Sequence, residues 1–296
     1  MLVPRQRIPD AIHFFFERQQ PRRDVQTHAR RLTREGLGLL FEQIKDRVVF
    51  KRDVGIFEGY IDCQLKKFDV FITLGGDGTI LNAITHVRNA PIPIMGINLG
   101  RLGFLASIEK KRISEAIALF VRGHYRLEER GLLYLESNLP LFGNTRFALN
   151  DCTLLKRDTS SMITIHTFIN GAYLNSYWAD GIIIATPTGS TGYSLSCGGP
   201  IVFPGSGNFV ITPVAPHNLN VRPVVISDSS VISFEVEGRT ENFLCTLDSR
   251  FESITSAHQL AVRKNDFNIR LIQLHDIGFM ETIRNKLAWG VDTRNY

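Results

Sequence analysis

The chain has 296 residues, of which 44% are hydrophobic and 21% charged, the composition of a globular protein with a substantial core. Its length exceeds that of most single cores, so we expect two domains or one large two-layered domain. The net charge of +5 is spread along the chain, and a dense cluster at residues 22–34 fits one face of an amphipathic helix. We therefore expect neither a nucleic-acid nor a membrane partner.

The four cysteines are scattered and none forms a C-x-x-C pair, so we expect reduced thiols in a chain of this length. They are Cys63, Cys152, Cys197 and Cys245. Near the N-terminus the only apolar stretch covers residues 11–16, before charge returns at Glu17. We expect no secretory signal and no membrane span, and we predict a cytoplasmic protein.

The first part of the chain alternates strand and helix patterns. In chain order these are a strand at 11–16, a helix at 24–45, a buried strand at 69–74, a glycine-rich turn at 75–78, a helix from 79, a strand at 93–97 and a helix at 113–121. This alternation predicts an α/β domain over residues 1–127 with a doubly wound parallel sheet.

From about Glu128 the pattern changes to period-2 stretches between tight turns. Residues 162–169 and 172–177 flank Asn170-Gly171, a pair that suits the type I′ turn of a hairpin. Residues 231–236 and 242–247 flank a second turn. We predict a β-rich, sandwich-like domain over 128–275, followed by a segment at 276–296 that packs back on the first domain.

The glycine-rich turn combines features of a phosphate site with a carboxylate. Gly75, Gly76 and Gly78 stand where a strand meets a helix, and there the backbone can approach a phosphate. Asp77 would repel a phosphate unless it orients and deprotonates a hydroxyl group, which points to phosphoryl transfer to an alcohol. The alternative is that Asp77 only caps the following helix.

A second polar segment follows an apolar strand. After Asp180 and the apolar residues 182–185 come the hydroxyl groups and glycines of residues 186–196, with Tyr193 as an aromatic face. This composition is typical of a nucleotide pocket. The alternative is an exposed Gly/Ser turn.

Taken together, the two segments resemble the NAD kinase family, whose motifs are GGDGT, an Asn-acidic pair and DG-x-x-x-x-TPTGSTAYS. These match Gly75 to Thr79, Asn150-Asp151 and Asp180 to Ser194, in the family's order. By itself, Asn150-Asp151 could equally be a turn before a strand. The resemblance extends from about Phe68 to Trp289.

The resemblance implies a kinase that phosphorylates the 2′-hydroxyl of the adenosine ribose of NAD to give NADP. It implies NAD bound between the two domains, ATP or polyphosphate as donor, Mg²⁺ or another divalent cation, and a homodimer or homotetramer. Asp77 matches the general base. The other residues implied to bind substrate are Gly75, Gly76, Gly78, Thr79, Asn150, Asp151, Asp180, Thr191, Gly192, Tyr193, Ser194, Ser196 and Ala215, and no protein metal ligand is assigned.

The chain departs from the family pattern at three of these places. Asp151 stands where glutamate is frequent, so its carboxylate is one methylene shorter. Gly192 replaces an alanine, which removes a methyl group from the pocket wall. Arg250 lies where a Gly-Gln pair is frequent, and it either approaches a phosphate or lies on the surface.

Two other functions remain open from the sequence. A lipid kinase of the diacylglycerol or sphingosine type carries a similar GGDG loop, although the polar segment at 186–196 and the Asn150-Asp151 pair suit a dinucleotide better. A non-catalytic NAD-binding sensor would keep the pocket, but the presence of Asp77 argues against it. Phosphate transfer to NAD or to lipid distinguishes these functions.

Overall fold

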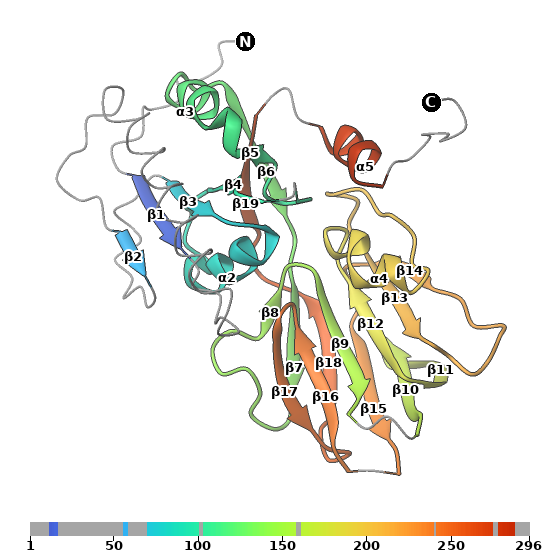
Figure 1. Cartoon of the computed structure of the whole chain (residues 1–296). Helices are drawn as coiled ribbons and strands as arrows, with labels where there is room; N and C mark the ends of the chain where they lie inside the picture. The colour runs from blue at the N-terminus through green and yellow to red at the C-terminus, as the bar shows by residue number, and fades with distance from the viewer. Residues whose placement is uncertain are drawn as a thin grey trace, which may run out of the picture. The chain divides into compact units, whose positions relative to one another are not determined.

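The computed structural model describes residues 12–16, 56–58, 70–100, 103–157, 161–239, 241–274 and 278–287. The helix expected at 24–45 and Cys63 lie outside these residues. The chain divides into two compact units, residues 1–129 with 269–296 and residues 130–268 (Figure 1). Residues 269–275, which the sequence pattern assigned to the second domain, thus group with the first, and the predicted domain boundaries remain a prediction.

A seven-stranded sheet forms the centre of the first unit, with strand order β2-β1-β3-β4-β19-β6 and β5 beside β4. The pairs among β1, β2, β3, β4 and β5, and the pair of β19 with β4, are parallel, as the sequence pattern predicts. The strands are β1 (Ile12–Phe16), β2 (Ile56–Glu58), β3 (Val70–Leu74), β4 (Ile94–Asn98), β5 (Ile108–Glu109), β6 (Tyr125–Arg130) and β19 (Ile269–Leu274).

Three α-helices belong to the described part of this unit: α2 (Asp77–Val87), α3 (Ile113–Val121) and α5 (Phe279–Leu287), and a 3₁₀ turn, η2 (Lys110–Arg112), precedes α3. Helix α2 buries Ile80, Ala83, Ile84 and Val87, the residues whose spacing is helical in the sequence. Strands β3 and β4 are buried along their whole length, which explains their continuous apolar sequence.

The second unit consists of two six-stranded sheets that share one hydrophobic core, which confirms the prediction of a strand-rich C-terminal region. One sheet has the order β11-β10-β15-β18-β7-β8 and the other β14-β13-β12-β9-β16-β17. The first contains β7 (Leu133–Ser137), β8 (Phe147–Ala148), β10 (Ile163–Ile169), β11 (Ala172–Ala179), β15 (Ile232–Glu237) and β18 (Leu260–Lys264). The second contains β9 (Asp151–Lys156), β12 (Gly181–Ala185), β13 (Asn208–Val214), β14 (Val224–Ser227), β16 (Phe243–Leu247) and β17 (Arg250–Ile254).

The predicted hairpin is present, whereas the strands around the second predicted turn separate. Asn170 and Gly171 connect β10 to β11 with φ angles of +50° and +80°, the conformation that a type I′ turn requires. Strands β15 and β16 follow one another in the chain but lie in different sheets. Period-2 patterns identify strands and do not specify their partners.

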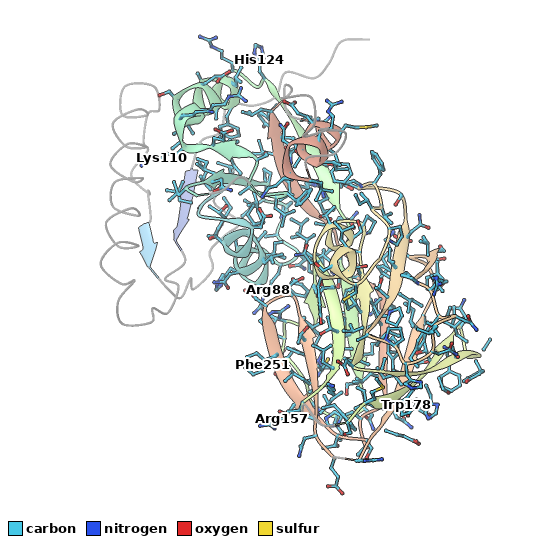
Figure 2. All side chains as sticks on the ribbon, turned by 45° about the vertical axis from the view of Figure 1, so that its right-hand side comes forward. Arg88, Lys110, His124, Arg157, Trp178 and Phe251 are labelled. Carbon is cyan, nitrogen blue, oxygen red and sulfur yellow. The ribbon has the colours of Figure 1, made fainter. Side chains whose placement is uncertain are left out.

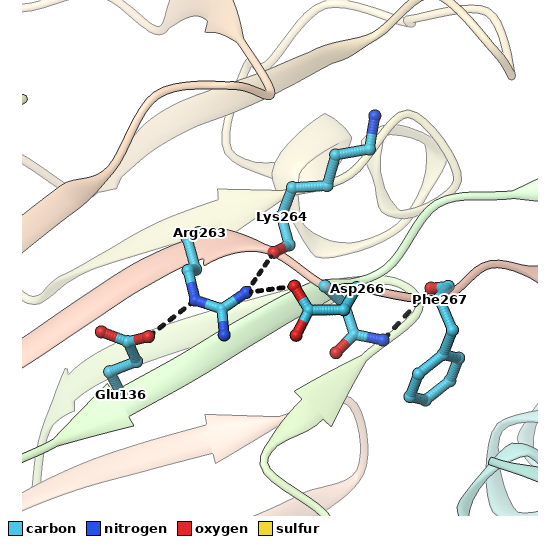
Figure 3. A network of polar contacts seen from close by, with 6 residues as sticks. Glu136, Arg263, Lys264, Asp266 and Phe267 are labelled. Carbon is cyan, nitrogen blue, oxygen red and sulfur yellow. Dashed lines mark hydrogen bonds and ion pairs between the residues drawn. The ribbon is translucent and has the colours of Figure 1, made fainter. Parts of the chain in front are cut away.

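Charged side chains join the surface of β18 to β7. Arg263 contacts Glu136 at 2.6 Å and Asp266 at 3.0 Å (Figure 3). Its guanidinium also lies 4.6 Å from the centre of the Tyr134 ring. Other large side chains of this unit face solvent, among them Trp178 and Phe251, which are 52% and 69% exposed (Figure 2). The ion pairs of Arg263 and the exposed rings of Trp178 and Phe251 thus belong to the surface of this unit and not to its core.

Candidate active site

Strand β3 leads into the glycine-rich turn, and α2 begins inside it. The N–H of Gly75 donates to the carbonyl of Ile97 at 3.0 Å, which ties the turn to β4. A Cβ at Gly75 would lie 2.0 Å from the hydroxyl of Thr79, so only glycine fits there. Gly76 and Gly78 are exposed, with nothing within 4 Å of a Cβ position. The first N–H groups of α2 thus adjoin an open backbone surface, which is the geometry of a phosphate site.

The carboxylate of Asp77 does not cap α2, so the capping alternative is wrong. The N-cap residue is Gly76, and no side chain makes a capping hydrogen bond. Instead, Oδ2 accepts the N–H of Phe104 at 2.7 Å, and Oδ1 accepts those of Leu105 at 3.1 Å and Ala106 at 2.9 Å. The side chain is half-buried. The carboxylate of Asp77 is therefore held in a fixed position, on a residue that is partly exposed.

In the second unit, the segment at 186–196 packs directly on the Asn150-Asp151 pair. The N–H of Thr186 donates to the carbonyl of Asn150 at 2.9 Å, and its hydroxyl donates to the carbonyl of Leu149. A Cβ on Gly189 would lie 2.0 Å from the carbonyl oxygen of Asn150, so glycine permits this approach. The structure thus brings together two motifs that are distant in the sequence.

Asp248, which sequence reasoning did not assign to the site, fixes the backbone of this pair. Its carboxylate accepts the N–H groups of Leu149 at 3.0 Å, Asn150 at 2.7 Å and Asp151 at 3.3 Å. In return its own N–H donates to the carbonyl of Asp151 at 3.0 Å. Asp248 has a φ of +53°, which aspartate tolerates in tight turns. The sequence pattern did not reveal this long-range contact.

The carboxyl groups of Asp151, which is buried, and Asp248, which is partly exposed, interact with one another. Burial raises the pKa of Asp151 to about 7, and repulsion by Asp248 adds to this effect. Burial also raises the pKa of Asp248, while its three backbone N–H partners and Arg250 act in the opposite direction. Among the described residues, none donates a hydrogen bond to the carboxylate of Asp151. Near neutral pH this pair of carboxyl groups therefore holds a proton that the same groups would lose in water.

Arg250 is engaged within the protein. Its guanidinium donates to the carbonyls of Thr145 and Phe147 and lies 5.8 Å from the ring centre of Phe142. Burial lowers its pKa, and Asp248 opposes this shift. The phosphate contact predicted for Arg250 stays a prediction. What the structure shows is a cation that ties the start of β17 to the segment before β8.

The hydroxyl groups of the segment at 186–196 differ in their surroundings. The segment forms a 3₁₀ turn, η3 (Gly189–Thr191), and a short helix, α4 (Tyr193–Ser196). The hydroxyl of Ser194 is buried and hydrogen-bonded to that of Thr212 at 2.8 Å, and the hydroxyl of Thr191 donates to the carbonyl of Thr188. Gly192 and Ser196 are exposed. Of these four residues, Gly192 and Ser196 are thus the most accessible to a ligand.

Tyr193 lies at the surface near two of the predicted site carboxylates. Its side chain is 41% exposed. Burial raises the pKa of the Tyr193 phenol, and the neighbouring Cys197, Asp180 and Asp151 raise it further. The charges of Asp151 and Asp180 thus act on the Tyr193 phenol.

Asp180 and Ala215 complete the predicted residues of this unit. The carboxylate of Asp180 forms an ion pair with Lys156 at 2.5 Å, and both side chains are partly exposed. Ala215 is exposed in a left-handed conformation, with a φ of +45°. Its place immediately after β13 leaves it accessible, and its predicted role as a pocket wall stays a prediction.

Comparison with known proteins identifies the family. Residues 37–125 match the ATP-NAD kinase N-terminal domain, and residues 149–274 match the ATP-NAD kinase C-terminal domain. The chain is 53% identical over 232 residues to an NAD kinase of Cytophaga hutchinsonii, and the aligned region covers 78% of this chain and 80% of that relative. The chain belongs to the ATP-NAD kinase family. The resemblance of the sequence motifs is thereby confirmed.

Two solved kinase structures have a similar fold. Yeast NADH kinase, solved in complex with NADH, has a TM-score of 0.80 and 21% identity, covering 97% of this chain and 90% of the yeast chain. An NAD kinase from Archaeoglobus fulgidus, solved in complex with ATP, has a TM-score of 0.74 and 24% identity, covering 94% and 98% of the two chains. The two-unit architecture is thus that of the family.

Three further observations concern metal ligands, membrane-spanning helices and cysteines. In the part of the chain that the structure describes, no group of three or more His, Cys, Asp or Glu side chains is arranged to hold a metal ion. No helix among the same residues combines the length and the apolar character needed to cross a bilayer. Cys152, Cys197 and Cys245 are free thiols.

Proposed function

We propose that this chain transfers the terminal phosphoryl group of ATP to the 2′-hydroxyl of the adenosine ribose of NAD, giving NADP, with Asp77 as general base. Membership of the ATP-NAD kinase family supports the substrates. The observation that carries the mechanism is the fixed, half-buried carboxylate of Asp77 at the open glycine turn. A carboxylate placed in this way can accept the proton of a hydroxyl group that attacks a phosphate beside it.

The turn supplies binding as well as chemistry. Gly76 and Gly78 leave the backbone open, so phosphate oxygens can approach the N–H groups at the start of α2. Thr79 is buried, and its side chain fills the space over Gly75. We assign these backbone groups to the phosphates and Asp77 to the hydroxyl, because a carboxylate repels the former and accepts a hydrogen bond from the latter.

The second unit would supply recognition of NAD. Asn150 offers both a donor and an acceptor, and Asp151 has a pKa of about 7, so it is a mixture of acid and carboxylate at neutral pH. The donor and acceptor groups of a ribose or an adenine match such a pair, and a site that hydrogen-bonds a hydroxyl group discriminates against analogues without it. Tyr193 adds an exposed aromatic face for a base.

A divalent cation, with Mg²⁺ as the first candidate, belongs to the proposal as part of the ATP substrate. Mg²⁺ in phosphoryl-transfer sites takes many of its ligands from phosphates and water, and it would neutralise charge on the phosphates. We also propose a cytoplasmic location and a homodimer or homotetramer. Light scattering of the eluted protein during gel filtration tests the oligomeric state.

The proposed activity is tested with purified protein, NAD, ATP and MgCl₂, with NADP detected by an NADP-specific dehydrogenase. Asp77→Asn should lower kcat by about 10²-fold or more while NAD binding persists. Asp266→Asn, a change at an exposed carboxylate of the second unit, is the matched control and should leave kcat unchanged. An Asp77→Asn protein with wild-type kcat removes Asp77 from the mechanism.

The two alternatives have distinct outcomes in the same experiment. Transfer to diacylglycerol or sphingosine with none to NAD would establish a lipid kinase. NAD binding without any NADP formation would establish a sensor. The comparisons favour neither.

A further inference from the structure

The carboxylate of Asp77 has almost no free hydrogen-bonding capacity. An ionised carboxylate offers about four lone-pair positions, two on each oxygen. Oδ1 accepts two N–H groups, from Leu105 at 3.1 Å and from Ala106 at 2.9 Å, so both of its positions are filled. Oδ2 accepts one N–H group, from Phe104 at 2.7 Å. One lone-pair position thus remains, and it belongs to Oδ2.

The residue before these three donors makes the arrangement possible. A Cβ on Gly103 would lie 1.8 Å from Oδ1 of Asp77, 2.4 Å from its Cγ and 2.7 Å from its Oδ2. Gly103 is buried, and its backbone is not in the left-handed region that would demand glycine by itself. The structure therefore explains the glycine at position 103 by the space that the Asp77 carboxylate occupies.

We propose that Gly103 is a positioning residue for phosphoryl transfer. Together with the N–H groups of residues 104–106 it orients Asp77 so that Oδ2 alone receives the proton of the acceptor hydroxyl. This inference rests on the proposed function, because it concerns how Asp77 is aimed and not whether Asp77 is the base. Backbone donors suit this task, since their positions are set by the chain and not by a rotamer.

The proposed transfer exchanges one P–O bond for another. The oxygen of the ribose hydroxyl forms a bond to the γ-phosphorus of ATP, and the bond from that phosphorus to the β,γ-bridging oxygen breaks, so ADP leaves. The hydroxyl proton passes to Oδ2 of Asp77, which becomes a carboxylic acid. Because Asp77 is half-buried, this proton can then pass to solvent and restore the carboxylate.

The test is Gly103→Ala, compared with Gly100→Ala in the same loop. The three atoms nearest to the new methyl group at 103 all belong to the Asp77 side chain, so we expect the fold to persist and the carboxylate to move. At Gly100 the nearest atom to a Cβ is Asn98 Oδ1 at 3.9 Å, so that methyl group is accommodated. A displacement of about 1 Å lowers a rate by roughly 10²-fold. We expect this loss in kcat for Gly103→Ala, unchanged KM values for NAD and ATP, and wild-type kinetics for Gly100→Ala.

A double-mutant cycle separates positioning from a general structural effect. In an Asp77→Ala background no carboxylate remains to be displaced, so Gly103→Ala should have no further effect on kcat. A crystal structure with NAD should place the ribose hydroxyl beside Oδ2 of Asp77. Three results would each overturn the proposal. The first is a wild-type kcat for Gly103→Ala, and the second is that Gly103→Ala lowers kcat as much in the Asp77→Ala background as in the wild type. The third is a ribose hydroxyl bound at Oδ1. The proposed function itself fails if Asp77→Asn is fully active or if no NADP forms at all. Both of these results can be told apart from the three that overturn the role of Gly103.

Discussion

The raised pKa of Asp151 predicts an unusual pH dependence of stability. Asp151 has its pKa raised from 3.8 to about 7 by burial and by Asp248. The folded protein therefore binds this proton more tightly than the unfolded chain, and stability falls as pH rises between about 4 and 7. Above pH 7 Asp151 is ionised in the folded protein, and the free energy of unfolding is lowered by the whole cost of this ionisation. Asp151→Asn removes the titrating group, so the variant escapes this cost.

The magnitude follows from the size of the shift. A pKa difference of roughly 3 units corresponds to about 4 kcal/mol above pH 7, an upper value because Asp248 shares the titration. About 1–2 kcal/mol of this is already present at pH 5. The free energy of unfolding of Asp151→Asn relative to wild type should therefore increase by roughly 2–3 kcal/mol between pH 5 and pH 8.

Urea unfolding of the ligand-free proteins at pH 5, 6, 7 and 8 measures this difference. The change with pH is the informative quantity, because any effect of the asparagine on packing is the same at every pH. Asp266→Asn, at a side chain that is 83% exposed, is the control and should show a constant difference from wild type. If the free energies of unfolding of Asp151→Asn and wild type change in parallel with pH, Asp151 does not have a raised pKa in the folded protein.

Three further changes test the contacts that hold the second unit together. Asp248→Ala leaves three backbone N–H groups without their acceptor, and it should lower the free energy of unfolding by about 3 kcal/mol or more in urea; a loss below 1 kcal/mol would contradict its role. Gly171→Ala forces alanine to a φ of +80° and should cost about 1–2 kcal/mol, measured in the same way, whereas no loss would mean that the turn relaxes. Arg263→Ala removes exposed ion pairs and should cost about 1 kcal/mol or less, decreasing in 1 M NaCl, and a salt-independent loss would point to packing.

Local patterns predicted most elements because burial and periodicity agree along the chain. Strand β3 and helix α3 occur where the apolar run and the helical spacing placed them. Helix α2 begins at Asp77, two residues earlier than the spacing indicated, because the glycine turn is already part of its first turn. The NG hairpin was predictable from the φ angles that these two residues favour.

Contacts between distant residues could not be predicted in the same way. The hydroxyl-directed role that the sequence suggests for Asp77 stays a prediction, and the binding of its carboxylate to the backbone of residues 104–106 depends on how two loops meet. Asp248 shows the same limit, since nothing in its own segment reveals that it holds Asn150 and Asp151. For Arg250 the sequence left open a phosphate contact or a surface position, and it could not show that backbone carbonyls engage the guanidinium.

The central claim is that this ATP-NAD kinase family member phosphorylates the ribose of NAD with the help of Asp77. Phosphorus NMR of a reaction with NAD, ATP and MgCl₂ tests it most directly, because the spectrum identifies the acceptor atom. We predict a new phosphomonoester at the 2′ position, formed in equal amount with ADP, and its near absence with Asp77→Asn. ADP formation without a phosphorylated NAD, or an unchanged yield with Asp77→Asn, would contradict the claim.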